Sequence, residues 1–370
     1  MKRNVLFNPR FINIMLAISA FLLFFSSVFF FCSFIRFSPI SETEISSPPA
    51  ADEYSKLIAG NYSGNLAQYT SSTISDARFY GQTCCWGSSL YYYQERQGES
   101  FLCKAPIATP SSGIPILKGY TISYINATDN KLFFIGNDNS EETAMSKIYS
   151  INIDGSDFSE VKINDQKQNV TSLVSNNNLI YFTLENDAKI YCTNTNSTDF
   201  IDTLFTFPSN HETVKLFGAD KDNIYYITDD NIGKIDIIEK VNKKISVECC
   251  SIFQSPILID KGILFLSDLT KPDLMFIPHS GDPIKIVSKD IISSMSNASL
   301  QYVNYSSGFI FLSIDNKIYY FNTQDKNPTL KELQGMPTFD GRIILTNEYC
   351  ISPTEKGDYI SQNINWLLAQ

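Results

Sequence analysis

Short apolar runs alternate with polar turns along most of the chain. The stretch DNIYYITDDNIGKIDI (222–237) is typical, because two runs rich in Ile and Tyr each follow a turn rich in Asp and Asn. Runs of about four to eight such residues, bounded by turn-forming residues, are typical of β-strands. The pattern therefore predicts a chain built from strands, with almost no room for helices.

A five-residue core similar to IYYIT (224–228) recurs along the chain. The other cores are LYYYQ (90–94), LFFIG (132–136), LIYFT (179–183), ILFLS (263–267), FIFLS (309–313) and RIILT (342–346). They recur about every 44 residues, with a shorter last interval of 33. A period of this size indicates an array of repeated structural units.

Each core lies within a unit of four predicted strands. One strand precedes the core, as in VKLFGA (214–219), and another follows it, as in KIYCT (189–193) and DYISQ (358–362). A fourth strand closes the unit, as in KISVE (244–248). Repeated four-stranded antiparallel units are typical of propeller blades. We therefore predict an all-β fold, a β-propeller of four-stranded blades over residues 59–370. Seven blades are favoured, and six blades with a C-terminal cover are the alternative.

The aromatic and branched residues of the cores are expected to pack between blades. A single four-stranded sheet leaves both apolar faces in water, and stacking successive sheets buries them. We interpret the Tyr and Phe runs as core and not as a ligand cage. The seventh unit has no obvious fourth strand, and the segment GNYSGNLAQYTSSTI (60–74) is available to complete its edge and close the ring.

The N-terminal region carries the clearest local signal. Residues 11–35 contain no charged side chain. A helix of this length rises about 37 Å, which is enough to cross a bilayer core of about 30 Å. We predict an uncleaved transmembrane helix. A cleaved secretory signal and a lipid anchor through Cys32 are the alternatives.

The charges around this span predict its orientation. Lys2, Arg3 and Arg10 precede it, whereas a single arginine follows it directly. The positive-inside rule then places residues 1–10 in the cytoplasm and the main domain on the extracytoplasmic side of the cell membrane. Residues 36–58, rich in Ser, Pro and Glu, are predicted to be a stalk.

Composition narrows the classes of partner. The chain of 370 residues has a net charge of −10 and an isoelectric point near 4.8. It shows no compensating cluster of Lys and Arg, so nucleic acid is excluded as a partner. A hydrophobic content of 43% excludes disorder for most of the chain.

Several short motifs resemble a known family. IYYITD (224–229) and ILFLSD (263–268) are similar to the YWTD signature of low-density-lipoprotein-receptor propellers. Together with GNYSGN (60–65) and IYSINIDGSDFSEV (148–161), they resemble bacterial extracellular proteins of unknown function that carry a propeller related to that receptor. The resemblance covers about residues 59–335. Trp is absent from every core, and only one unit keeps a clear IDG. The resemblance implies a propeller and recognition, and brings no catalytic residues.

Candidate catalytic and metal-binding groups are few. The two histidines, His211 and His279, lie in polar, turn-like sequence and are interpreted as surface loop residues. No nucleophile elbow, phosphate-binding loop or zinc helix is present in the sequence. Acidic clusters at 136–142, 154–160 and 229–231 could offer oxygen ligands to calcium, but turn formation is the favoured reading. We therefore assign no catalytic, cofactor-binding or metal-binding residue.

The eight cysteines predict buried thiols more than disulfides. Cys32 lies within the predicted span. The remaining seven are Cys84, Cys85, Cys103, Cys192, Cys249, Cys250 and Cys350. An extracytoplasmic domain permits disulfides, and Cys85 with Cys103 is a conceivable pair. Six N-x-S/T sequons, starting at Asn61, Asn126, Asn169, Asn196, Asn297 and Asn304, occur about as often as chance predicts and carry no evidence of glycosylation.

These observations favour a membrane-anchored extracytoplasmic recognition module, with no identifiable catalytic site. A protein, peptide or cell-envelope glycan is the expected partner, beside the membrane itself. The alternatives are an extracellular propeller enzyme, a lyase or hydrolase acting at the central channel, and a structural or sensor subunit. A channel mouth with clustered carboxylates, Tyr or His would favour the enzyme, whereas a face with exposed aromatics would favour recognition.

Overall fold

The computed structural model describes residues 81–368 with internal gaps. The gaps are residues 129, 142–144, 164–167, 177–178, 196–200, 209–213, 229–230, 246–255, 260–261, 268–272, 279–283, 288–299, 307, 324–328, 338–341, 347 and 356. The chain divides into two units, and every described residue belongs to the second, residues 50–370. The predicted head, span and stalk lie outside the described residues. Within the described part, no helix has the length and apolar character needed to cross a membrane.

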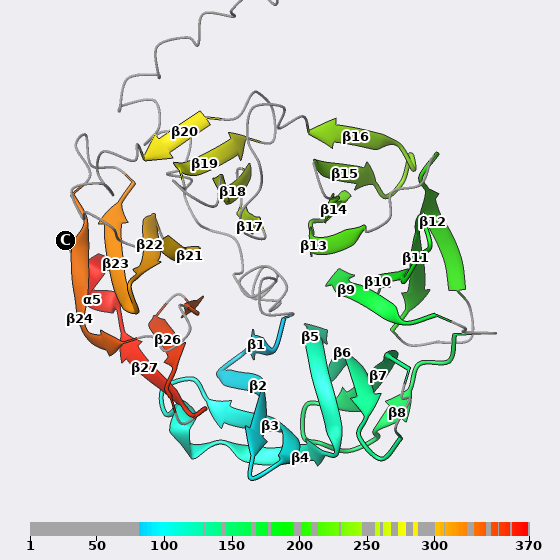
Figure 1. Cartoon of the computed structure of the whole chain (residues 1–370), viewed down its shortest axis with the longest axis horizontal. Helices are drawn as coiled ribbons and strands as arrows, with labels where there is room; N and C mark the ends of the chain where they lie inside the picture. The colour runs from blue at the N-terminus through cyan, green and yellow to red at the C-terminus, as the bar shows by residue number, and fades with distance from the viewer. Residues whose placement is uncertain are drawn as a thin grey trace, which may run out of the picture. The chain divides into compact units, whose positions relative to one another are not determined.

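The second unit is an all-β propeller of seven blades, as predicted. Each blade is an antiparallel sheet whose strands pair in chain order. Figure 1 shows the blades arranged radially, with the first strand of each blade innermost. The six-bladed alternative is therefore wrong.

The first four blades have four strands each. Blade 1 contains β1 (Thr83–Trp86), β2 (Ser89–Arg96), β3 (Glu99–Pro106) and β4 (Ile114–Lys118), with the short 3₁₀ helix η4 (Pro110–Ser112) before β4. Blade 2 contains β5 (Tyr120–Thr128), β6 (Lys131–Asp138), β7 (Lys147–Asn152) and β8 (Ser159–Glu160). Blade 3 contains β9 (Val170–Asn176), β10 (Leu179–Leu184), β11 (Lys189–Asn194) and β12 (Ile201–Thr206). Blade 4 contains β13 (Lys215–Ala219), β14 (Asn223–Ile227), β15 (Ile232–Asp236) and β16 (Asn242–Ile245).

The last three blades follow the same order. Blade 5 contains β17 (Ile257–Ile259), β18 (Gly262–Ser267), β19 (Asp273–Pro278) and β20 (Ile284–Val287). Blade 6 contains β21 (Leu300–Ser306), β22 (Phe309–Ile314), β23 (Lys317–Asn322) and β24 (Lys331–Pro337). Blade 7 contains β25 (Ile344–Leu345), β26 (Tyr349–Pro353) and β27 (Tyr359–Asn363), followed by the one-turn helix α5 (Asn365–Leu368).

Six of the seven predicted cores form the second strand of a blade. The seventh prediction, that RIILT is the core of the last unit, is wrong. RIILT contains β25, which is the first strand of blade 7. The second strand is β26, with the sequence YCISP, and no strand was predicted there. β26 begins at residue 349, forty residues after β22 begins at residue 309, so the repeat continues at its usual spacing. The last interval between predicted cores was only 33 residues because RIILT, which contains the first strand of blade 7, resembles the other cores more closely than the second strand YCISP does.

Apolar side chains fill the interfaces between neighbouring blades. One cluster joins blade 1 to blade 2, a second joins blades 2 and 3, and a third joins blades 3 and 4. A larger cluster spans blades 4, 5 and 6, and two more join blade 6 to blade 7 and blade 7 to blade 1. Core tyrosines and phenylalanines such as Tyr91, Phe133 and Phe182 are almost completely buried. The prediction that the aromatic cores pack between blades is confirmed.

Buried asparagines tie the first strands of neighbouring blades together. Asn126 on β5 donates from Nδ2 to the carbonyl oxygen of Leu173 on β9, at 3.3 Å. Asn304 on β21 donates in the same way to the carbonyl of Ile343, just before β25, at 2.8 Å. Both side chains are buried, so the asparagines of these two N-x-S/T sequons have a structural role in joining blades.

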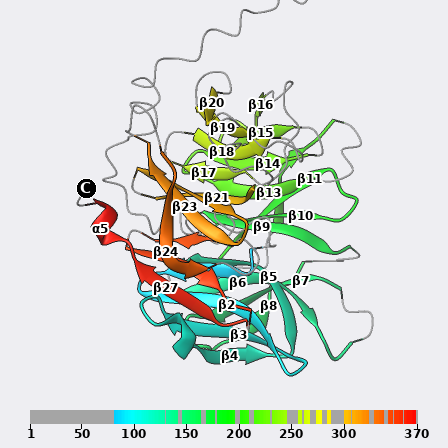
Figure 2. The ribbon, with the colours of Figure 1, turned by 60° about the vertical axis from the view of Figure 1, so that its left-hand side comes forward.

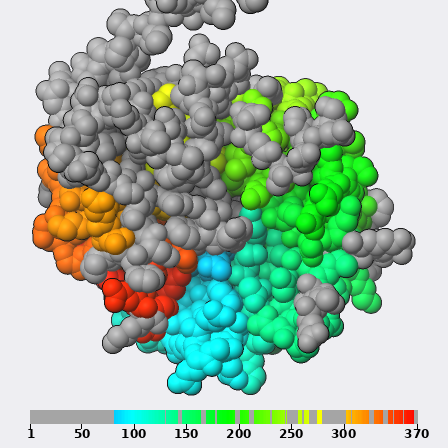
Figure 3. All heavy atoms as spheres, viewed as in Figure 1, coloured from blue at the N-terminus to red at the C-terminus, as the bar shows by residue number. Residues whose placement is uncertain are grey.

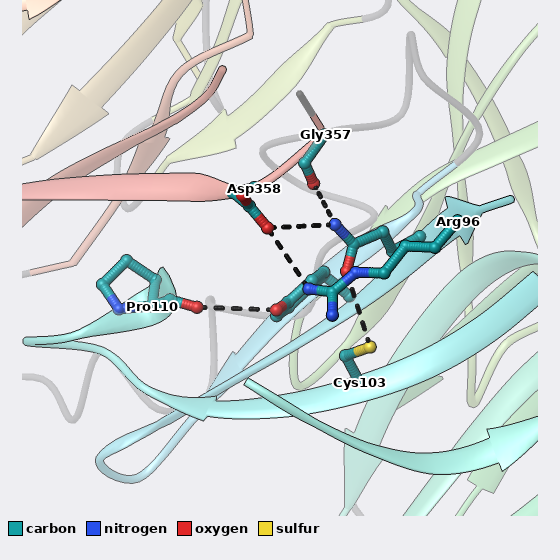
Figure 4. A network of polar contacts seen from close by, with 7 residues as sticks. Arg96, Cys103, Pro110, Gly357 and Asp358 are labelled. Carbon is teal, nitrogen blue, oxygen red and sulfur yellow. Dashed lines mark hydrogen bonds and ion pairs between the residues drawn. The ribbon is translucent and has the colours of Figure 1, made fainter. Parts of the chain in front are cut away.

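The first and last blades meet through polar side chains on β2 and the turn before β27 (Figure 4). Gln94 donates from Nε2 to the carbonyl oxygen of Gly357 at 2.7 Å and to Asp358 Oδ1 at 3.3 Å. Arg96 Nη2 forms an ion pair with Asp358 Oδ1 at 3.2 Å. This pair is solvent-exposed, so its contribution to stability is small.

A pair of buried aromatic rings joins the same two blades. The rings of Tyr92 and Tyr359 pack at 4.7 Å between centroids. Within blade 7, the buried Arg342 donates to the Tyr359 hydroxyl at 2.9 Å and so helps to hold that ring. Figure 2 and Figure 3 show the last blade lying directly beside blade 1. Within the described residues blade 7 has three strands, and the segment 60–74 predicted to complete it lies outside them.

Candidate functional site

The acidic clusters form turns where the structure describes them. Asp138 accepts hydrogen bonds from the backbone N–H of Ser140 at 2.9 Å and from its hydroxyl at 2.7 Å. Asp154 makes the same two bonds with Ser156, at 2.9 and 2.7 Å. These bonds lower the pKa of both carboxyl groups. The turn role predicted for these residues is therefore observed, while Asp229 and Asp230 lie outside the described residues, as do His211 and His279.

The five cysteines in the described part of the chain are thiols that form no disulfide. Cys84, Cys85, Cys103 and Cys350 are buried, and Cys192 is half-buried. Cys85 lies opposite Leu90 on β2, whereas Cys103 lies opposite Tyr92 on the other side of the same strand. Because β2 separates them, the conceivable disulfide between Cys85 and Cys103 does not form, and the interpretation as thiols is confirmed for these residues. Cys32, Cys249 and Cys250 lie outside the described residues.

The metal-binding types of side chain do not gather into a site in the described part of the chain. No group of three or more His, Cys, Asp and Glu side chains there is arranged to hold a metal ion. Burial raises the pKa of Cys85, Cys103, Cys192 and Cys350, which makes these four thiols weak nucleophiles near neutral pH. The candidate site is instead an aromatic surface on blade 2.

Three rings of blade 2 form this aromatic surface, which we define as Tyr120, Tyr149 and Phe158. Tyr120 begins β5, Tyr149 lies on β7, and Phe158 lies in the turn just before β8. Phe158 stacks on Tyr149 with centroids 5.3 Å apart and meets Tyr120 edge-on at 5.2 Å. Tyr149 is buried, Tyr120 is half-buried, and Phe158 is 36% exposed. The cluster therefore has a buried base and an open outer ring.

The strand register explains why these rings meet. Phe134 on β6 lies directly opposite Tyr149 on β7, so both side chains point to the same face of the blade. Their rings stack at 6.0 Å, which makes Phe134 the floor of the surface. Gly136 leaves room for the Tyr149 ring, because a Cβ atom there would lie 2.9 Å from Tyr149 Cδ2. The packing of β6 against β7 thus fixes the orientation of the surface.

Carboxylates lie beside two rings of this surface, since Asp138 lies opposite Tyr120 in the sheet and Glu160 lies opposite Tyr149. Burial raises the pKa of Tyr120, and the nearby Asp138, Glu141 and Glu160 raise it further. Burial also raises the pKa of Tyr149 to about 12, with contributions from Tyr120 and from the same three carboxylates. Glu160 forms an ion pair with Lys147 at 3.0 Å. The surface therefore combines aromatic rings with a mainly negative surround.

The IDG turn that supports Phe158 is anchored on blade 1. Lys104 donates from Nζ to the carbonyl oxygen of Ile153 at 3.0 Å. Gly155 adopts a positive φ of 91°, and a Cβ atom there would lie 3.2 Å from Ile116 Cβ. The turn is thus held against β3 and β4, which positions the residue that follows it.

Sequence reasoning did not single out this surface, because it assigned aromatic residues to the core and polar turns to loops. Tyr149 and Phe134 fit the core assignment, but Phe158 does not, since it is the only aromatic residue in the turn sequence IDGSDFSEV (153–161). A large apolar side chain within a polar turn was the available signal.

No protein-family model and no curated protein sequence matches this chain. Among solved structures, virginiamycin B lyase from Staphylococcus aureus is similar, with a TM-score of 0.50 and 15% identity over 75% of this chain and 92% of the lyase chain. The computationally designed Ika8 protein gives a TM-score of 0.47 at 9% identity, over 76% of this chain and 95% of its own. A chain of a nidogen/laminin complex gives 0.44 at 8% identity, over 65% of this chain and 92% of its own. At this low sequence identity, the structural similarity to the lyase shows that this chain shares the propeller fold. It shows nothing about the activity of this chain.

Proposed function

We propose that this protein is a membrane-anchored extracytoplasmic module that recognises a protein, peptide or cell-envelope glycan. The observation that carries the proposal is the partly exposed aromatic surface of blade 2. Its outer ring, Phe158, is 36% exposed while the rings beneath it are packed. A rigid, amphipathic surface of this kind offers contact area at a low entropic cost, which suits binding.

The fold supports recognition because it supplies a stable frame. Apolar clusters join every blade to the next around the ring. Turns between strands can then differ from blade to blade without loss of the core. The IDG turn of blade 2 has this arrangement, since its backbone is held on blade 1 while Phe158 faces solvent. We further propose kinship with the bacterial extracellular proteins that the YWTD-like motifs resemble.

The membrane anchor is supported by the charge-free residues 11–35 and by the basic residues that precede them. Protease added to intact cells tests the orientation. The blades should become accessible to a protease that is active on the outside, whereas a tag fused before Met1 should remain protected. Protection of both ends in intact cells would contradict the extracytoplasmic location.

Binding is tested with the full chain in mild detergent, incubated with a cell-envelope extract. We expect a retained ligand whose amount falls in the variant Phe158→Ala. Ile238→Ala is the matched control, because Ile238 is an exposed apolar residue, 83% exposed, on the turn between β15 and β16. Equal retention by the wild type and Phe158→Ala would contradict the role of the surface. Turnover of an envelope carbohydrate that is unaffected by Phe158→Ala would favour an enzyme over a recognition module.

A further inference from the structure

We infer that the aromatic surface of blade 2 binds a cationic side chain, a lysine or arginine carried by a basic segment of a protein partner. The inference rests on the proposed function, since it names the chemistry of the ligand at the same surface. Three observations lead to it: the geometry of the rings, the charges around them, and the matching position in blade 3.

The ring geometry suits a cation. Phe158 stacks on Tyr149 with an interplanar angle of 16°, and Tyr120 lies edge-on to both rings at about 60°. Phe158 is the most exposed of the three, so an approaching group meets an aromatic ring. The face of such a ring attracts an ammonium or guanidinium group within about 6 Å of its centroid.

The surrounding charges favour a cation over other ligands. Asp138 lies directly opposite Tyr120 in the sheet and Glu160 directly opposite Tyr149, so two carboxylates flank the rings, and together with Glu141 they raise the pKa of both phenols. One of the three, Glu160, is engaged in an ion pair with Lys147. An acidic ligand would be repelled here, and a neutral sugar would not gain the charge attraction that a cation gains. The net charge of −10 also draws basic partners from a distance.

Blade 3 shows the same interaction within the chain. Lys147 and Tyr149 of blade 2 occupy the same places in their strand as Lys189 and Tyr191 of blade 3, because β7 and β11 both begin with KIY. In blade 3, Lys189 Nζ lies over the Tyr191 ring, 6.0 Å from its centroid, and 3.8 Å from the carboxylate of Asp187. A lysine ammonium thus contacts both a ring and a carboxylate.

In blade 2 the chain's own lysine is used differently. Lys147 pairs with Glu160 on β8, and the Tyr149 ring is covered by Phe158. Phe158 extends the stack of rings outward, and Asp138 lies opposite Tyr120 at its side. An external cation would therefore lie over the Phe158 ring, much as Lys189 lies over the Tyr191 ring in blade 3.

The test measures binding of a fluorescently labelled hexalysine peptide to the full chain in neutral detergent, by fluorescence anisotropy. Hexaglutamate and chitohexaose serve as the acidic and the neutral probe. Phe158→Leu keeps the charge and most of the apolar volume but removes the aromatic face, and Glu160→Gln removes one carboxylate. Glu332→Gln is the matched control, because Glu332 pairs with Lys317 at 3.2 Å at the corresponding place in blade 6.

We expect hexalysine to bind, and Phe158→Leu and Glu160→Gln each to weaken it about two- to fivefold. Glu332→Gln should leave the affinity unchanged, and hexaglutamate should not bind. Equal binding by wild type and Phe158→Leu would overturn the inference, since attraction by net charge alone would then explain the affinity. Chitohexaose binding that depends on Phe158 would also overturn it, while the recognition function would stand. If no probe and no envelope ligand bound in a Phe158-dependent way, both proposals would fail.

Discussion

Replacing Asn126 with Ala tests how the blades are joined. Asn126 is completely buried on β5, where the strand bulges at Tyr124, a residue with a φ of 51°. Its Nδ2 donates to the carbonyl oxygens of Tyr124 at 2.8 Å and Leu173 at 3.3 Å. Its Oδ1 accepts from the N–H of Ser175 at 3.2 Å. One side chain thus stabilises the bulge and binds the next blade.

The magnitude follows from the groups left behind. The variant Asn126→Ala removes three bonds to blade 3, one to the Leu173 carbonyl and two from the N–H and hydroxyl of Ser175, and so takes the partner from two backbone groups at the interface. A buried polar group that loses its partner costs about 1–3 kcal/mol. Since the Leu173 carbonyl bond is long, we take the lower half of the range and expect a loss of about 2–4 kcal/mol in the free energy of unfolding. For a domain of this size, about 2 °C of midpoint per kcal/mol gives a fall of about 4–8 °C.

Thermal unfolding followed by circular dichroism in detergent checks this value. Asn152→Ala is the control, because Asn152 makes its two bonds, to Ser156 Oγ and Asp157 Oδ2, at the surface. The control should shift the midpoint by about 1 °C or less. A midpoint for Asn126→Ala within 1 °C of the wild type, or an equal fall in both variants, would refute the reasoning.

Four further measurements follow from the structure. Asn304→Ala should lower the midpoint about as much as Asn126→Ala, and the two effects should add in the double variant, because the sites lie on different blades; a double variant no worse than either single one would contradict this. Between about pH 10 and pH 12 the free energy of unfolding should fall, because burial holds the pKa of Tyr149 at about 12 and the unfolded phenol ionises near pH 10; urea titrations should show a smaller fall in Tyr149→Phe, and identical slopes would argue against it. In brief alkylation followed by peptide mapping, the half-buried Cys192 should react before the buried Cys103, and the reverse order would contradict the burial. Deleting residues 59–80 should lower the unfolding midpoint if they complete blade 7, and an unchanged midpoint would exclude them as its fourth strand.

The repeat and the fold class were predictable because they depend on local patterns. The period of the apolar cores, with polar turns between them, requires strands that bury both faces by stacking. The same residues, such as Tyr91 and Phe182, were recognisable as core because both are flanked by other apolar residues within a short run. The error at RIILT had a local cause as well, since this segment around β25 has three consecutive aliphatic residues, whereas β26 has a single Ile among Tyr, Cys, Ser and Pro.

The interfaces between blades depend on contacts between residues that are distant in the sequence. No sequence pattern predicted these contacts. Gln94 and Gly357 are bonded at the junction of blades 1 and 7 although 263 residues separate them. Asn126 matched a glycosylation sequon, yet burial and its bonds to blade 3 make it part of the frame. The separation of Cys85 from Cys103 by β2 likewise required the strand order.

The sequence by itself determined that the chain is an array of sheets, because strand periodicity and turn chemistry act over a few residues. Only the tertiary structure decided that there are seven blades and which side chains close the ring. It also decided that Phe158 reaches back over Tyr149 and Tyr120 with carboxylates around it. Such an arrangement arises when a turn is held against the neighbouring blade. The sequence could not predict it, because packing brings together residues whose spacing along the chain follows no recognisable pattern.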